Sequence, residues 1–160
     1  MTHTDPQHLI RALGLALHPE GGHYREVHRS DVGVGAPAGY SGERIALTAI
    51  YFLLQRGEFS AFHRVRGEEV WVHLAGDPLE LVLLGEEVEV LSLAPVGRPG
   101  RPLQVVPPGI WQAARTRGAW TLATCLVAPG FEFADFELPG RAALLKEYPG
   151  HATWVLRFTH

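Results

Sequence analysis

The sequence predicts a mainly β protein built as an antiparallel sandwich or barrel, and three observations predict it. Short runs rich in Val, Ile, Leu, Phe and Trp recur between Tyr24 and about Leu138. They follow one another at spacings of roughly 8–12 residues without intervening helical periods, as is typical of such folds. The 18 glycines and 12 prolines lie mostly between these runs, where turns need them.

Helices are predicted only near the two ends. In "TDPQHLIRALGL", Asp5 can cap a helix, Pro6 suits its first position and Gly14 can end it. A short C-terminal helix is predicted in "GRAALLKEYP", and the tail 151–160 fits either a strand or a short helix. The long loop 30–43 is a candidate lid or dimer-contact segment.

Composition and charge indicate a soluble globule and a single domain over residues 1–160. A net charge of −3 and the absence of any basic run argue against a nucleic-acid partner. The sequence contains no run of about 18 apolar residues, so no membrane partner is expected. The stretch "MTHTDPQHLI" lacks the basic and apolar regions of a signal peptide, so a cytoplasmic location is expected. The single cysteine, Cys125, lies in an apolar run and is expected to be a small buried hydrophobe.

The stretch "FHRVRGEEVW" (62–71) contains a histidine and two glutamates that could form a functional site. A three-residue loop over 65–67, with Gly67 in the left-handed region, would make a hairpin that opposes His63 and Glu69 on one face. Arg64 and Glu68 would then form a surface ion pair. Trp71 and His73 continue the face of Glu69, whose carboxylate would need a partner if covered.

Two motifs carry a resemblance to a known family. Gly57, His63, Val65, Glu69 and Gly76 have the spacing of the first cupin motif, and "PPGIWQAAR" partly matches the second, with Gln112 in its last metal position. The chain resembles cupin family five, RmlC-like jelly rolls of unknown function, over about residues 18–138. The resemblance implies a cupin-type double-stranded β-helix or jelly-roll barrel, with its core at about 20–138, an internal pocket and a homodimer.

The resemblance also locates the metal positions of cupins at His63, Val65, Glu69 and Gln112. Valine cannot ligate, and an amide is a poor ligand for a transition metal. No cofactor is therefore expected; if a divalent transition metal were bound, His63, Glu69 and Gln112 would be its ligands.

Each candidate residue has a structural alternative. His63 and Glu69 are either a catalytic dyad, with His63 as base and Glu69 as its orienting partner, or a polar pair that fixes a hairpin. Gln112 is either a core amide or a ligand contact, and Trp71 either core or an aromatic platform. His73 is a further candidate for ligand binding, although its role is open.

The stretch "HPEGGHYRE" holds further candidates. The resemblance suggests that Tyr24 and Arg25 lie near the pocket; the alternative is an exposed edge strand. His18, Glu20 and His23 are possible metal chelators, and Gly21-Gly22 permits a sharp turn or a close backbone approach. Near the other end, Asp135 and Glu137 alternate with phenylalanines and are expected on the solvent side of a strand.

Three functions remain open. The first is a metal-independent isomerase or epimerase that acts on a carbohydrate-like or other small polar metabolite. The second is a non-catalytic module that binds or senses such a metabolite. The third is a metal-dependent cupin enzyme with a reduced His/Glu site.

Overall fold

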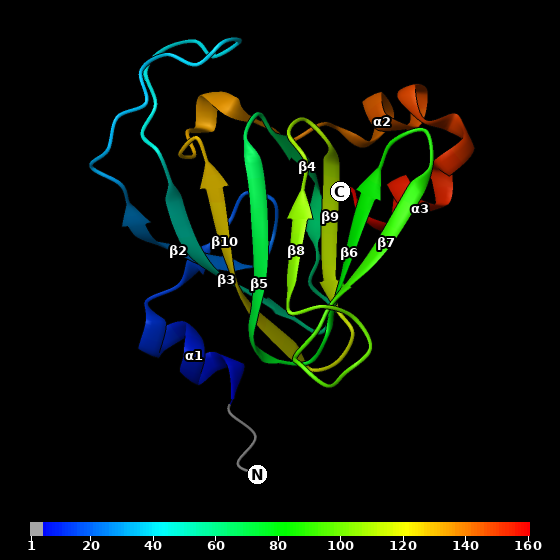
Figure 1. Ribbon diagram of the computed structural model, residues 1–160. Helices are drawn as coiled ribbons and strands as arrows, with labels where there is room; N and C mark the ends of the chain where they lie inside the picture. Colours follow the sequence, from blue (N-terminus) through cyan, green and yellow to red (C-terminus); the bar gives the residue numbers. More distant parts are fainter. Residues whose placement is uncertain (1–4) are drawn as a thin grey trace.

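A computed structural model describes residues 5–160. The chain forms two antiparallel sheets that face each other, as the ribbon in Figure 1 shows. The six-stranded sheet has the order β1-β2-β3-β10-β5-β8 and the five-stranded sheet the order β11-β4-β9-β6-β7. The predicted jelly-roll architecture is confirmed.

The strands of the six-stranded sheet come from both halves of the chain. They are β1 (Ala16–Leu17), β2 (His23–Arg29), β3 (Thr48–Gln55), β5 (Glu68–Gly76), β8 (Leu103–Val106) and β10 (Trp120–Ala128). The five-stranded sheet consists of β4 (Ser60–Val65), β6 (Leu79–Leu84), β7 (Val88–Leu93), β9 (Trp111–Thr116) and β11 (Phe136–Glu137).

The alternation of side chains along β3 shows why both faces of the six-stranded sheet are apolar. Phe52 and Leu54 point between the sheets and join the interior core with Trp71 and Leu81. Leu53 points the other way, into the cluster that helix α1 (Pro6–Leu13) covers. Because successive side chains of a strand point to opposite faces, one apolar run serves both layers.

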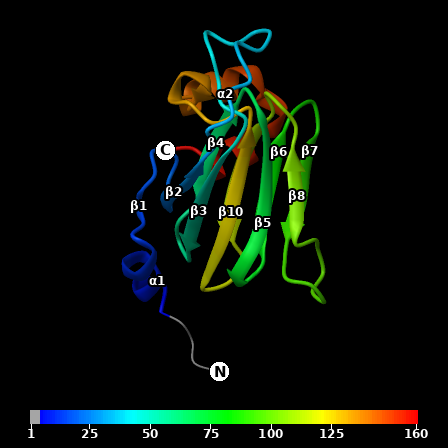
Figure 2. The same ribbon diagram turned by 60° about the vertical axis from the view of Figure 1, so that its left-hand side comes forward.

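Helix α1 has the predicted capping. The Asp5 side chain accepts a hydrogen bond from the backbone N–H of Gln7 at 3.0 Å, Pro6 is its first residue, and Gly14 ends it with φ 63°. The left-handed conformation at Gly14 costs glycine little. In Figure 2 the helix lies at one end of the sheet beside β1, and it packs on the sheet's outer face.

The C-terminal segment is helical and covers the outer face of the five-stranded sheet. It contains α2 (Arg141–Glu147), the 3-10 turn η2 (Pro149–His151) and α3 (Ala152–Arg157). Leu144, Val155 and Phe158 pack there against Trp111 and Phe62. Of the two structures considered for the tail 151–160, the helix is the one that forms.

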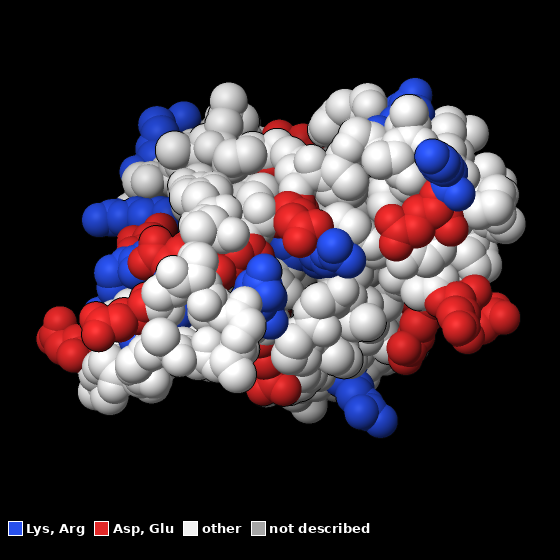
Figure 3. Space-filling view, turned by 90° about the horizontal axis from the view of Figure 1, so that it is seen from above, with Lys and Arg blue, Asp and Glu red and all other residues white. Residues whose placement is uncertain are grey.

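Loop 30–43 rises above one end of the barrel (Figure 1) and is anchored at its base by a buried ion pair. Arg44 donates from Nε and Nη2 to the two carboxylate oxygens of Asp135, at 2.7 and 2.8 Å. Asp135 lies in the 3-10 turn η1 (Phe133–Asp135), so its expected place on the solvent side of a strand is wrong. Glu137 is exposed as expected and pairs with Arg64 at 2.8 Å. On this end of the molecule, basic and acidic side chains alternate (Figure 3).

Candidate active site

A cavity of about 470 Å³ lies between the two sheets, at the end where β1 and β2 form the sheet edge. Its walls combine apolar and aromatic side chains with a small number of polar groups, which is typical of small-molecule sites. The titratable groups of the interior include His18, Glu20, His63 and Glu69. The apolar wall includes Ile50, Phe52, Val65, Val127, Phe131, Phe133 and Phe136.

The predicted hairpin between β4 and β5 does not form. β4 pairs with β9 and β11, whereas β5 pairs with β10 and β8, so residues 66–67 carry the chain from one sheet to the other. Gly67 is not among the glycines with positive φ. A Cβ there would lie 2.8 Å from the carbonyl oxygen of Ala128, so close approach of two chain segments is what requires glycine. The expected ion pair of Arg64 with Glu68 is also wrong, since Arg64 pairs with Glu137.

His63 and Glu69 nevertheless both line the cavity, from opposite sheets. Gln112 connects them: its Cα is the β-sheet partner of His63, and its Nε2 donates to Glu69 Oε2 at 2.6 Å. Trp71 donates from Nε1 to Gln112 Oε1 at 2.9 Å, which fixes the orientation of the amide. Within residues 5–160, His63 and Glu69 make no direct hydrogen bond or ion pair with each other.

The partner of His63 is Glu20, whose sequence context suggests only a possible metal chelator. Glu20 Oε2 lies 3.2 Å from His63 Nε2, and the two side chains are 7% and 3% exposed. The Ser60 hydroxyl donates to the other carboxyl oxygen, Oε1, at 2.8 Å. Glu20 therefore takes the place beside the imidazole that was assigned to Glu69.

A tight turn between β1 and β2 delivers Glu20 to this position. Gly21 and Gly22 both have positive φ, 107° and 76°, and a Cβ on Gly21 would collide with the carbonyl oxygen of Phe59. The close approach lets the backbone N–H of Ala61 donate to the Glu20 carbonyl at 2.7 Å. The Gly-Gly pair after Glu20 was the sequence signal for this approach, although it does not say which strand is approached.

Backbone contacts determine which nitrogen of each histidine carries the proton. His63 Nδ1 lies 2.8 Å from the Ala61 carbonyl oxygen, which can only accept, so Nδ1 is protonated and the neutral ring turns the lone pair of Nε2 toward Glu20. His18 Nδ1 accepts the backbone N–H of Glu20 at 3.2 Å. Burial lowers the pKa of His63 and lowers that of His18 to about 4, so both rings are neutral near pH 7.

Burial shifts the two carboxyl groups in the opposite direction. It raises the pKa of Glu20 to about 8, against the partial compensation of the Ser60 hydrogen bond. It also raises the pKa of Glu69 to about 7, and the hydrogen bonds from Gln112 and Cys125 oppose that rise. Near neutral pH, Glu20 is mainly a carboxylic acid that can donate to His63 Nε2, and Glu69 is close to half ionised.

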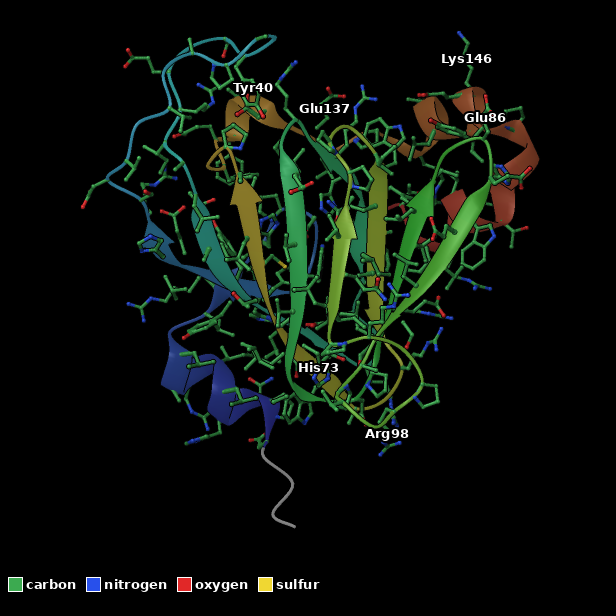
Figure 4. All side chains as sticks on the ribbon, viewed as in Figure 1. Tyr40, His73, Glu86, Arg98, Glu137 and Lys146 are labelled. Carbon is green, nitrogen blue, oxygen red and sulfur yellow. The ribbon has the colours of Figure 1, made fainter. Side chains whose placement is uncertain are left out.

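The other predicted site residues lie in different parts of the barrel. Tyr24 and Arg25 line the cavity near its opening. Trp71 and Gln112 are buried behind Glu69 and are not among the lining residues. His73 lies at the opposite end of β5, near the loop that carries Arg98 (Figure 4), and its Nε2 contacts the Asp77 carbonyl at 3.2 Å. Nδ1 of His23 lies 3.8 Å from Oε1 of Glu58, and His23 is not among the residues lining the cavity.

Comparison with known proteins agrees with this architecture. The family model described as cupin superfamily (DUF985) matches residues 7–139. The chain belongs to the cupin superfamily. No curated protein matches it.

Two solved structures are similar to this cupin along its whole length. A hypothetical protein from Leishmania major is 30% identical, with a TM-score of 0.90 and coverage of 98% of this chain and 99% of the other. A protein from Shewanella oneidensis is 34% identical, with a TM-score of 0.89 and coverage of 98% of both chains. Oxalate decarboxylase from Bacillus subtilis, at 11% identity and a TM-score of 0.56 over 89% of this chain and 36% of the other, shares the fold alone.

The side chains at the metal positions of the superfamily do not fit a transition metal. Val65 has no donor atom, and the oxygen of Gln112 is occupied by the indole of Trp71. Among the residues from Asp5 onward, no group of three or more His, Cys, Asp or Glu is arranged to hold a metal ion. That the protein needs no cofactor stays a prediction.

Proposed function

We propose that this cupin is an isomerase or epimerase that moves protons on a small, polar, carbohydrate-like substrate with its own side chains. The observation that carries the proposal is the 3.2 Å contact of Glu20 with His63 in the same cavity as Glu69. The cavity then offers two carboxyl groups of different protonation, one of them coupled to an imidazole. The roles first expected of His63 and Glu69 change accordingly.

The two carboxyl groups suit the roles of acid and base. Burial raises the pKa of both groups, to about 7 for Glu69 and about 8 for Glu20, so that each can take up or release a proton near neutral pH. Their contacts differ: Glu20 lies 3.2 Å from the neutral imidazole of His63, to which its protonated form can donate, whereas Glu69 accepts a hydrogen bond from the Gln112 amide, which favours its ionised form. Glu69 is therefore the proposed base and Glu20 the proposed acid.

The proposed chemistry balances within the chain. Glu69 removes the proton from a carbon next to a substrate carbonyl, and Glu20 gives its proton to the carbonyl oxygen, so that an enediol or enol forms. When Glu69 returns the proton to the neighbouring carbon, the Glu20 carboxylate takes the proton of the hydroxyl that becomes the new carbonyl, which gives the isomer. When a proton from solvent reaches the opposite face of the original carbon, Glu20 takes back the proton on the oxygen and Glu69 releases its own to solvent, which gives the epimer. The Ser60 hydroxyl, which donates to Glu20 at 2.8 Å, stabilises the carboxylate that Glu20 becomes midway.

The positions of the supporting residues favour a preorganised site. Gln112 donates to the Glu69 carboxylate at 2.6 Å within the buried core, and Trp71 in turn donates to the Gln112 oxygen at 2.9 Å. The Ala61 carbonyl fixes the tautomer of His63. A site held this way loses little entropy when the reaction begins.

The size and walls of the cavity support the substrate class. Ligand sites commonly occupy about 300–1,000 Å³, and this cavity, at about 470 Å³, suits a small metabolite. Tyr24, Phe52 and Phe136 supply aromatic surface against which the apolar face of a sugar can pack. The acidic and imidazole groups then meet its hydroxyl and carbonyl groups.

Proton exchange with solvent tests the proposal directly. The wild type, Glu20→Gln and Glu69→Gln would be incubated in D₂O with a panel of aldoses, ketoses and sugar acids, and deuterium at carbon followed by NMR. We expect exchange with at least one substrate, lowered by about 10²–10⁴-fold in either variant. Glu86→Gln, an exposed side chain in the β6–β7 turn (Figure 4), is the matched control.

The same experiment separates the alternatives. A ligand that binds in the cavity without exchange would support the metabolite-binding module instead. Elemental analysis of protein purified without affinity tag or chelator tests the third alternative, and a transition metal near one per chain would overturn the proposal.

A further inference from the structure

Two guanidinium groups lie at the opening of the cavity, and only one of them is neutralised. Arg29 donates to Glu26 at 2.8 and 3.0 Å and to Glu132 at 3.0 Å, and it also reaches the Phe131 carbonyl. Two carboxylates thus hold this arginine in place. The N–H donors of Arg29 are occupied by these protein acceptors, so little of its charge is available to a ligand.

Arg25 has no such partner. Its Nη1 donates to the Leu13 carbonyl at 3.2 Å, at the C-terminus of α1, and within residues 5–160 no carboxylate lies within ion-pair distance of it. The side chain is exposed, lines the cavity and rests against Gly14. A guanidinium carries five N–H donors, so most of those of Arg25 remain open to a ligand.

We propose that Arg25 binds the carboxylate of the substrate, which makes a small hydroxy or keto acid, such as a sugar acid, the substrate class of this cupin. The inference rests on the proposed function for the reacting end of the molecule. The carboxylate lies at the cavity mouth on Arg25, and the hydroxyl-bearing carbons reach inward to Glu20, His63 and Glu69.

The charge distribution favours one anionic group over a diphosphate. A nucleotide sugar would bring at least two negative charges, and clamping them calls for several cations. Arg115 is engaged with Glu80 at 3.0 Å and is not among the residues lining the cavity, and Arg29 is neutralised. One open guanidinium matches one carboxylate, which it can bind through two parallel hydrogen bonds.

Equilibrium binding to matched pairs of ligands tests the inference apart from catalysis. Glucuronate, galacturonate and gluconate would be compared with glucose, galactose and glucitol by calorimetry, using wild type, Arg25→Gln and Arg25→Lys. We expect the acids to bind and the neutral sugars to bind at least about 10-fold more weakly. Arg25→Gln should weaken the acids by about 10- to 100-fold, and Arg25→Lys should restore part of the loss. Arg98→Gln, on a loop at the other end of the barrel (Figure 4), is the control.

Two comparisons keep the outcomes distinct. Glu20→Gln should still bind the acids through Arg25, because it changes the reacting end only; binding without deuterium exchange in the wild type would therefore sink the proposed function but leave the Arg25 site intact. Neutral sugars that bind or exchange as well as the acids, an Arg25→Gln variant with unchanged affinity for them, or no binding of any acid at millimolar concentration would overturn the inference. Thermal unfolding of Arg25→Gln shows whether loss of its bond to Leu13 disturbs α1.

Discussion

Replacing Glu20 by glutamine should stabilise the protein at neutral pH. Glu20 has a pKa of about 8 in the folded chain, against 4.5 as an ordinary side chain. Between these two pH values the unfolded chain gives up the proton and the folded chain keeps it. The free energy of unfolding therefore falls by about 1.4 kcal/mol for each pH unit in that range.

The size of the effect follows from the pH range. pH 7 lies about 2.5 pH units above 4.5, so at pH 7 the buried carboxyl lowers the free energy of unfolding by roughly 3 kcal/mol relative to a side chain that does not ionise. Glutamine has the shape of the protonated acid, and its amide can donate to His63 Nε2 while its oxygen accepts from Ser60. Glu20→Gln should thus gain roughly 3 kcal/mol at pH 7, and the gain should vanish near pH 4.

Urea unfolding of both proteins at several pH values between 4 and 8 measures this difference. Glu86→Gln, in which an exposed carboxyl is replaced, should stay within about 0.5 kcal/mol of wild type throughout. A Glu20→Gln variant that loses several kcal/mol at pH 7 would refute the reasoning. It would mean that Glu20 is ionised and paired with an imidazolium, whose charge the variant leaves buried alone.

Three further predictions use other parts of the structure. The rate of deuterium exchange should rise with pH through about 7, because Glu69 becomes ionised and can act as a base. It should fall again through about 8, because Glu20 loses its proton, and a pH–rate profile that is flat from pH 6 to 9 would contradict these roles. Asp135→Ala should lower the denaturant concentration at the unfolding midpoint, because it removes the carboxylate that accepts two hydrogen bonds from Arg44. Arg44→Met with Asp135→Leu should recover much of that loss, and equal losses in both variants would show that the pair itself holds the loop. The predicted homodimer should give about twice the chain mass in light scattering at micromolar concentration, and a monomer mass would end that prediction.

Local sequence signals predicted the elements whose causes are local. Asp5, Pro6 and Gly14 bound α1 as expected, because capping depends on residues within one turn of the helix. The apolar runs form strands of the two sheets, because the apolar pattern of a strand and the turn residues that end it both lie within one short segment. The resemblance to cupins supplied the jelly-roll topology, which no local pattern contains.

The pairing of β4 with β5 was predicted wrongly because Gly67 is compatible with two different local structures. Gly67 suits a left-handed hairpin position, and it also suits a place where another segment passes close to the backbone. Here the carbonyl of Ala128, which is distant in sequence, approaches it. The prediction that His63 and Glu69 share an interior survived in part, since both do line the cavity, although they reach it from different sheets.

Glu20 could not be assigned its place from sequence for a related reason. Its position beside His63 depends on a contact between segments about 40 residues apart, in which Ala61 donates to the Glu20 carbonyl. A glutamate followed by two glycines signals a tight turn, but the partner of that turn is decided by how the barrel closes. Gln112 shows the same limit: its two bonds, to Trp71 and Glu69, join strands of both sheets.

The two buried carboxyl groups should lower the stability of the fold and support catalysis, and these opposite effects distinguish a catalytic site from a structural one. Burial raises the pKa of Glu20 and Glu69, and the free energy lost in doing so produces an acid and a base near neutral pH. If the two carboxyl groups serve catalysis, Glu20→Gln and Glu69→Gln should both unfold at higher denaturant concentration than wild type at pH 7 and both lose deuterium exchange. If they are structural polar groups, the same variants should lose stability while binding of any ligand changes little. Measuring both quantities on the same two variants therefore decides between the two roles even before a natural substrate is known.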